Sequence, residues 1–132
     1  MQIKIFLIIF LLQIALTFQH MCKTCKSHTL YVWLLYIIHH LLDVFLFWSF
    51  LFLTTRMEFG IHLILLITMS IHWISYGNKC ILTVLMNREC GYPENRWLDS
   101  LKNMLGFRNI SEYFHFIWIF ILAIQDIYMI FI

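Results

Sequence analysis

Charge is scarce in this sequence. Only 12% of the 132 residues are charged, whereas 62% are hydrophobic. Soluble domains have about 25% charged and about 45–50% apolar residues, so these few charges cannot cover the surface of a soluble protein. Lipid must therefore form part of the solvent of this chain. The net charge of +2 is also too small to indicate a nucleic-acid partner.

Proline and glycine are scarce as well, and several familiar site motifs are absent. One proline and four glycines exclude a low-complexity linker, and the chain has no internal repeat. We therefore expect a single transmembrane domain that covers residues 1–132. The sequence has no serine-hydrolase spacing, phosphate-binding loop, H-E-x-x-H motif or pore-type selectivity filter, so these classes of site are excluded.

Long apolar runs take the place of the missing polar surface. A helix needs about 20 apolar residues to cross a bilayer. Four runs approach or exceed this length, and we expect spans at residues 3–18, 30–53, 59–76 and 113–132. The predicted fold class is thus an all-α membrane protein with four transmembrane helices. Only Arg56 and Glu58 carry charge between the second and third spans, so these spans should form a tight antiparallel hairpin.

The first run has an alternative interpretation as a secretory signal, because Lys4 precedes a hydrophobic stretch. Residues 17–20 lack the small-x-small pattern of a cleavage site. This favours a retained first span.

A polar segment separates the third and fourth runs. Pro93 suits the first turn of a helix, and Glu94 is favourable beside the positive end of the helix dipole. Apolar side chains then share one helix face, namely Trp97, Leu98, Leu101, Met104 and Leu105. The pattern predicts a short interfacial amphipathic helix that ends at Gly106, with a helix packed on the other loops as the alternative.

Lysine and arginine are unevenly distributed between the two sides that four spans would create. Seven lie in loop one (residues 20–28) and in loop three, which follows the third span, namely Lys23, Lys26, Lys79, Arg88, Arg96, Lys102 and Arg108. Two lie on the other side, at Lys4 and Arg56. The positive-inside rule therefore places loops one and three on the cytosolic side or its topological equivalent, with both termini opposite.

Four spans put all four cysteines on one side. Cys22-x-x-Cys25 lies in loop one, and Cys80 and Cys90 lie in loop three. The layout resembles quinone-linked disulfide-generating membrane enzymes, which are four-span bundles with a cysteine pair in each of two loops on the same side. This resemblance implies a thiol–disulfide oxidoreductase, with Cys22/Cys25 and Cys80/Cys90 as redox pairs and a quinone as acceptor.

Two other interpretations of the cysteines stay open. The C-x-x-C spacing suits one half of a tetrahedral zinc site, in which Cys22, Cys25, Cys80 and Cys90, or the nearby His20 and His28, would be the ligands. The remaining interpretation is a structural disulfide or unreactive thiols.

Histidines in the second and third spans suggest a haem site. His39 or His40 and His72 lie nearer the same membrane face, and bis-histidine haem sites in helix bundles use such pairs. The alternative is packing: His39 and Asp43 are four residues apart on a helix, so their side chains can pair, with His72 at the interface.

The last span is apolar on every side, apart from Gln125 and Asp126 near its end. It has no small-x-x-x-small pattern for close helix approach. We therefore expect it to pack more loosely than the second and third spans. We expect Asp126 to lie at the membrane interface or to pair with a neighbouring chain.

A short segment carries a second resemblance. His72-Trp73 followed by Asn78-x-Cys80-x-Leu82-Thr83 is similar to a segment of small multi-span membrane proteins in bacteria and large DNA viruses. That resemblance implies no catalytic role, and on the viral side it implies a protein of the internal membrane of a virion. An accessory subunit of an organelle membrane complex is the other setting.

We therefore predict a non-catalytic structural or accessory membrane component, with the lipid bilayer and other protein subunits as partners. Catalytic residues, cofactors and metals are not expected on this interpretation. The alternatives are the thiol–disulfide oxidoreductase and a haem-binding anchor subunit.

Overall fold

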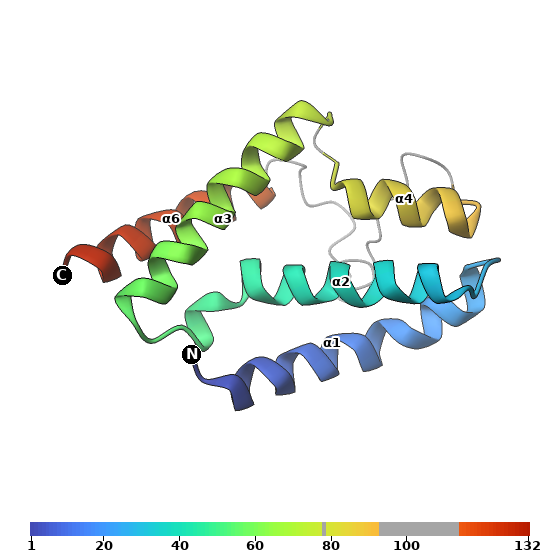
Figure 1. Cartoon of the computed structure of the whole chain (residues 1–132), viewed down its shortest axis with the longest axis horizontal. Coiled ribbons are helices and arrows are strands. Elements are labelled where there is room, and N and C mark those ends of the chain that lie inside the picture. The colour runs from blue at the N-terminus through green and yellow to red at the C-terminus, as the bar shows by residue number, and fades with distance from the viewer. Residues whose placement is uncertain (78, 93–113) are drawn as a thin grey trace.

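The computed structural model describes residues 1–77, 79–92 and 114–132, and these residues form an all-α structure (Figure 1). The helices are α1 (Ile3–Thr24), α2 (Leu30–Phe47), the short 3-10 helix η1 (Ser49–Leu51), α3 (Arg56–Ser75), α4 (Ile81–Cys90) and α6 (Phe114–Phe131). Figure 1 shows α1 and α2 running side by side in opposite directions, with α4 beside α2. Helices α3 and α6 form a second pair, which is displaced along the long axis of the molecule.

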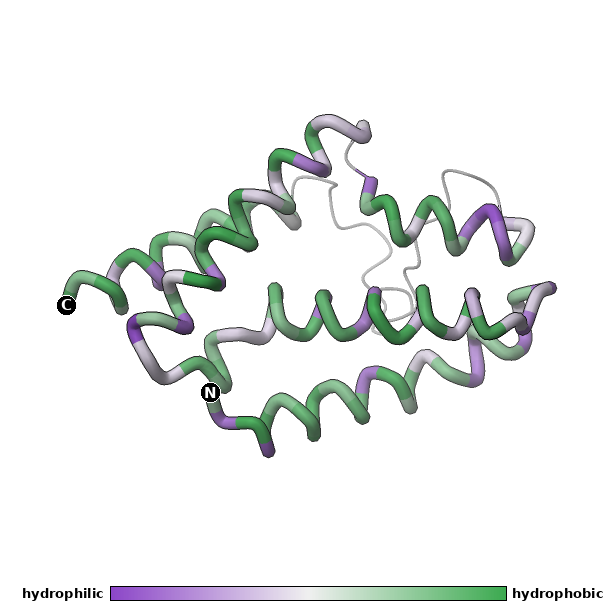
Figure 2. The backbone as a smooth tube through the Cα atoms, in the orientation of Figure 1, coloured by the Kyte–Doolittle hydropathy of each residue, from purple (hydrophilic) through white to green (hydrophobic). Residues whose placement is uncertain are grey.

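The helices are apolar along most of their length (Figure 2). By length and composition, α1, α2 and α3 are each suited to cross a membrane, and Phe116–Phe131 adds a shorter apolar helix at the carboxyl-terminal end. This agrees with the predicted all-α membrane fold class. The predicted amphipathic helix after Pro93 lies outside the described residues.

Helix α1 is longer than predicted. It continues from Ile3 to Thr24, so Cys22 lies in its last turn and Cys25 is its C-cap residue. The polar residues after Phe18 do not break a helix, because none of them is glycine or proline. The C-x-x-C motif therefore lies on a helix end and not in an open loop.

Helix α2 is shorter than predicted, because it ends at Phe47 and not at Leu53. The chain then forms η1, and Phe52 and Leu53 become buried against the start of α3. A capping box restarts the helix: the Thr55 side chain accepts from the Glu58 N–H while Glu58 accepts from the Thr55 N–H. Glu58 also binds the amino group of Met1, which brings the amino terminus to this connection.

The predicted tight hairpin of the second and third spans is wrong. Helices α2 and α3 diverge from their connection, and the main partner of α3 is α6. The flanks of α2 are occupied by α1 and α4, whereas α3 meets only the last part of α2, for example where Leu66 packs near Leu46. The expectation that the last span packs more loosely than this hairpin is wrong for the same reason. One flank of α6 does stay open, with Ile117, Ile121 and Ile124 exposed.

Helix α4 was not predicted. It follows the positive-φ residue Gly77 and ends at Gly91, whose φ of 70° is the left-handed conformation that glycine favours. The Tyr92 N–H then donates to the Asn87 carbonyl at 2.8 Å, which completes a Schellman-type end. Helix α4 packs its buried residues Met86 and Cys90 against the first half of α2.

Candidate functional site

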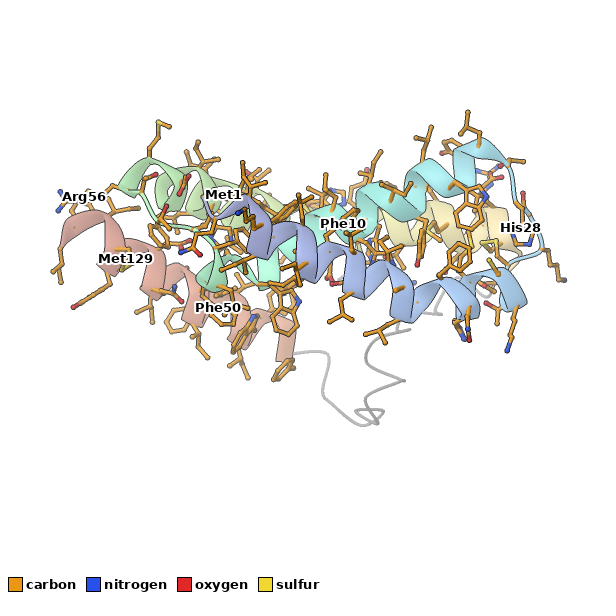
Figure 3. All side chains as sticks on the ribbon, turned by 90° about the horizontal axis from the view of Figure 1, so that it is seen from below. Met1, Phe10, His28, Phe50, Arg56 and Met129 are labelled. Carbon is orange, nitrogen blue, oxygen red and sulfur yellow. A yellow bond between two sulfur atoms is a disulfide. The ribbon has the colours of Figure 1, made fainter. Side chains whose placement is uncertain are left out.

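The Cys25–Cys90 disulfide lies at the end of the molecule near His28 (Figure 3). Cys25 forms a disulfide with Cys90, with a Cα–Cα distance of 4.4 Å, while Cys22 and Cys80 are free thiols. The bond thus joins one cysteine from each of the two predicted redox pairs. Neither Cys22–Cys25 nor Cys80–Cys90 is formed, because α4 runs back along α2 and carries Cys90 to the end of α1.

Polar contacts reinforce the disulfide. The Lys26 N–H donates to the Cys90 carbonyl at 3.4 Å, and the hydroxyls of Thr24 and Tyr92 hydrogen-bond to each other. These contacts and the disulfide hold the same end of α4 on the turn between α1 and α2. Because the disulfide occupies Cys25 and Cys90, the four cysteines do not meet as zinc ligands. Within residues 1–77, 79–92 and 114–132, no three His, Cys, Asp or Glu side chains are placed to hold a metal ion.

A buried hydrogen-bond network joins α1 to α2. The Gln13 amide nitrogen lies 2.8 Å from His40 Nδ1 and donates to Asp43 Oδ2 at 2.5 Å. His40 Nε2 lies 3.1 Å from the Thr17 hydroxyl, which also contacts the Tyr36 hydroxyl. Both ring nitrogens of His40 are therefore engaged within the helix pair. Gln13, Thr17 and Tyr36 were not predicted as site residues, although Gln13 and Thr17 share one helix face four residues apart.

A second buried pair joins α3 to α6. His62 Nδ1 lies 2.6 Å from Asp126 Oδ2, and His62 Nε2 lies 3.2 Å from the Leu46 carbonyl oxygen. His62 and Asp126 are 0% and 1% exposed, which corrects the expectation that Asp126 lies at the interface or pairs with a neighbouring chain. Lone ionisable residues in apolar helices usually pair inside a bundle. The presence of His62 in the third apolar run and Asp126 in the fourth was therefore the sequence feature that could have predicted this pair.

Two other predicted haem ligands, His39 and His72, contact residues at the start of α4, after the break that follows α3. His72 Nε2 accepts the Ile81 N–H at 3.2 Å, which satisfies one of the free N–H groups at the start of α4. The His39 side chain hydrogen-bonds to Cys80, the N-cap residue of α4, and lies within electrostatic range of Asp43. The haem candidates His39, His40 and His72 thus each bind a different protein group, and they do not form one ligand pair.

The electrostatics at Cys80 favour the thiolate. Burial raises the pKa of the Cys80 thiol, but the hydrogen bond with His39 and the positive charge of that ring lower it. The Leu82 and Thr83 N–H groups also lower it, and the resulting pKa lies below the ordinary value of a cysteine. The thiolate of Cys80 is therefore more stable than that of an ordinary cysteine.

No protein family, curated protein or solved structure matches this chain. The candidate sites therefore have to be interpreted from their own geometry.

Proposed function

We propose that this chain is a non-catalytic, multi-pass integral membrane protein that serves as a structural or accessory subunit of a larger membrane assembly. The observation that carries the proposal is that polar side chains of the helices are buried in the molecule while large apolar side chains are exposed on its outside. Buried polar side chains of α1 and α2, and of α3 and α6, bind one another between helices, as in Gln13–His40 and His62–Asp126. The outward residues of the same helices are large and apolar, for example Leu11 on α1, Ile64 on α3 and Phe120 on α6.

In this proposal α1, α2, α3 and α6 cross the bilayer, and loops one and three share a side. Two contacts support that arrangement. The amino group of Met1 binds Glu58, and the Arg56 guanidinium donates to the carbonyl oxygen of Ile132 at 3.1 Å, so both termini lie at the α2–α3 connection. The Cys25–Cys90 disulfide joins loop one to the segment after α3.

The positive-inside rule assigns loops one and three to the cytosolic side. A cytosolic disulfide is commonly transient, catalytic or redox-sensing, because glutathione and thioredoxin keep thiols reduced there. One proposed cellular setting is the internal membrane of a virion, following the resemblance of the His72-Trp73 segment. The other is an organelle membrane complex.

The test is purification of the full chain from its native membranes in a mild detergent. We expect other subunits to elute with it in fixed stoichiometry, no Soret absorbance band, and no quinone reduction with a dithiol donor. A chain that elutes alone and reduces quinone, with the activity lost in Cys22→Ser and Cys25→Ser variants, would reject the proposal in favour of the oxidoreductase.

A further inference from the structure

A free thiol lies beside the disulfide on the same helix end. Cys22 is exposed in the last turn of α1, and Cys25 follows three residues later. Residues three apart on a helix have Cβ atoms about 5–6 Å apart, and a disulfide needs about 3.5–4.5 Å. Cys25 is the C-cap residue and has an extended conformation, so the movement that would bring these two sulfurs together falls at the end of the helix.

The existing disulfide is shielded from solvent. Cys25 is 5% exposed and Cys90 is 0% exposed, since both pack among Met21, Val32 and Met86. A dissolved thiol therefore reaches this bond poorly, whereas Cys22 lies only three residues from Cys25 along the chain. The exposed position of Cys22 would also make any disulfide that it forms accessible from solution.

We propose that Cys22, Cys25 and Cys90 form a thiol–disulfide switch that controls the docking of α4 on the α1–α2 pair. The Cys22 thiolate attacks the Cys25 sulfur, a Cys22–Cys25 bond forms, the Cys25–Cys90 bond breaks, and Cys90 leaves as a thiolate that takes up a proton. One disulfide and one thiol are present before and after the step, so no external oxidant or reductant is consumed.

The exchange would change what holds α4. While the Cys25–Cys90 disulfide is intact, three contacts fix the carboxyl-terminal end of α4. They are the disulfide itself, the Lys26–Cys90 hydrogen bond and the Thr24–Tyr92 contact. In the exchanged state the covalent link is lost and only packing and hydrogen bonds remain. The role of this switch in the cell rests on the proposed function, which places this end of the molecule on the cytosolic side. There, glutathione would reduce the Cys22–Cys25 bond after the exchange.

The test uses the purified full chain in detergent, with glutathione as the reductant. We expect reduction of the Cys25–Cys90 bond to be roughly tenfold slower in Cys22→Ser than in the unaltered protein, because the internal route is lost. Cys80→Ser removes the other free thiol and should leave the rate unchanged. Samples quenched in acid and digested with pepsin should show the Cys22–Cys25 linkage by mass spectrometry before reduction is complete.

Equal reduction rates for Cys22→Ser and the unaltered protein would overturn the switch, as would the absence of a Cys22–Cys25 peptide at every time point. Far-ultraviolet circular dichroism and elution volume check that each variant is folded. These outcomes do not depend on which membrane side the cysteines occupy, so a failure of the switch is distinguishable from a failure of the proposed function.

Discussion

At the scale of single residues, the buried His62–Asp126 contact is the clearest link between α3 and α6. In hydrocarbon an unpaired polar group has no water to bind, so each partner depends on the other. Measured side-chain hydrogen bonds between membrane helices contribute about 0.6 kcal/mol on average and up to about 1.7 kcal/mol.

Replacement of one partner should therefore destabilise the chain itself. We expect Asp126→Leu to lower the free energy of unfolding by about 1–2 kcal/mol, because His62 is left buried without its partner. The double variant His62→Leu with Asp126→Leu should regain part of this loss, since no polar group is then orphaned. Unfolding in increasing sodium dodecyl sulfate measures both, with Gln125→Leu as the neighbouring control. Equal losses in the single and double variants would contradict the pairing.

A second prediction at this scale concerns Cys80. Its lowered pKa means that the thiolate is favoured by His39, so His39→Leu should raise the midpoint of its titration. In a Cys22→Ser background the rate of iodoacetamide modification, followed against pH, reports this midpoint. We expect a midpoint below the ordinary value of a cysteine with His39 present and a higher one without it. A midpoint that does not move would show that His39 does not act on this thiol.

At the scale of elements, the apolar runs predicted which parts of the chain are helical better than they predicted helix partners. The runs at residues 3–18 and 59–76 became α1 and α3 with changed ends, because hydropathy does not register a helix that continues through polar residues such as Gln19 and His20. The end of α2 at Phe47 has no glycine or proline to mark it in the sequence, and the chain forms η1 before the capping box at Thr55 starts α3. Helix α4 was missed because Ile81–Met86 is too short an apolar run to cross a membrane.

Two glycines give opposite expectations for helix stability. Gly60 lies inside α3, and an added Cβ there meets no atom within 4 Å. Gly60→Ala should raise the free energy of unfolding by about 0.5–1 kcal/mol. Gly91 has a φ of 70°, and an added Cβ lies 3.3 Å from the Lys26 side chain. Gly91→Ala should lower the free energy of unfolding by about 1 kcal/mol.

Thermal denaturation in one detergent compares the two glycine variants directly. A change of the same sign in both would contradict the assigned helix interior at Gly60 and helix end at Gly91.

At the scale of the whole molecule, long-range pairings were beyond the reach of sequence reasoning. The four cysteines were visible, but the partner of Cys25 depends on α4 folding back along α2, and nothing local to Cys90 encodes that path. Similarly, an aspartate in an apolar run predicts that Asp126 has a polar partner, but it does not predict that the partner is His62. The partner depends on which helices become neighbours in the fold. The composition, in contrast, predicted the apolar outer surface directly, because 12% charged residues are too few to cover the outside of the molecule.

The central claim is that the chain crosses the membrane several times, with the Cys25–Cys90 end and the α2–α3 connection on opposite sides. The most direct measurement is labelling with a membrane-impermeant maleimide in sealed vesicles of known orientation. In a Cys80→Ser background, Cys22 reports one end, and an Arg56→Cys variant that also carries Cys22→Ser reports the other. We expect Cys22 to be labelled from the cytosolic side and Arg56→Cys from the opposite side only. Labelling of both positions from the same side would contradict the account.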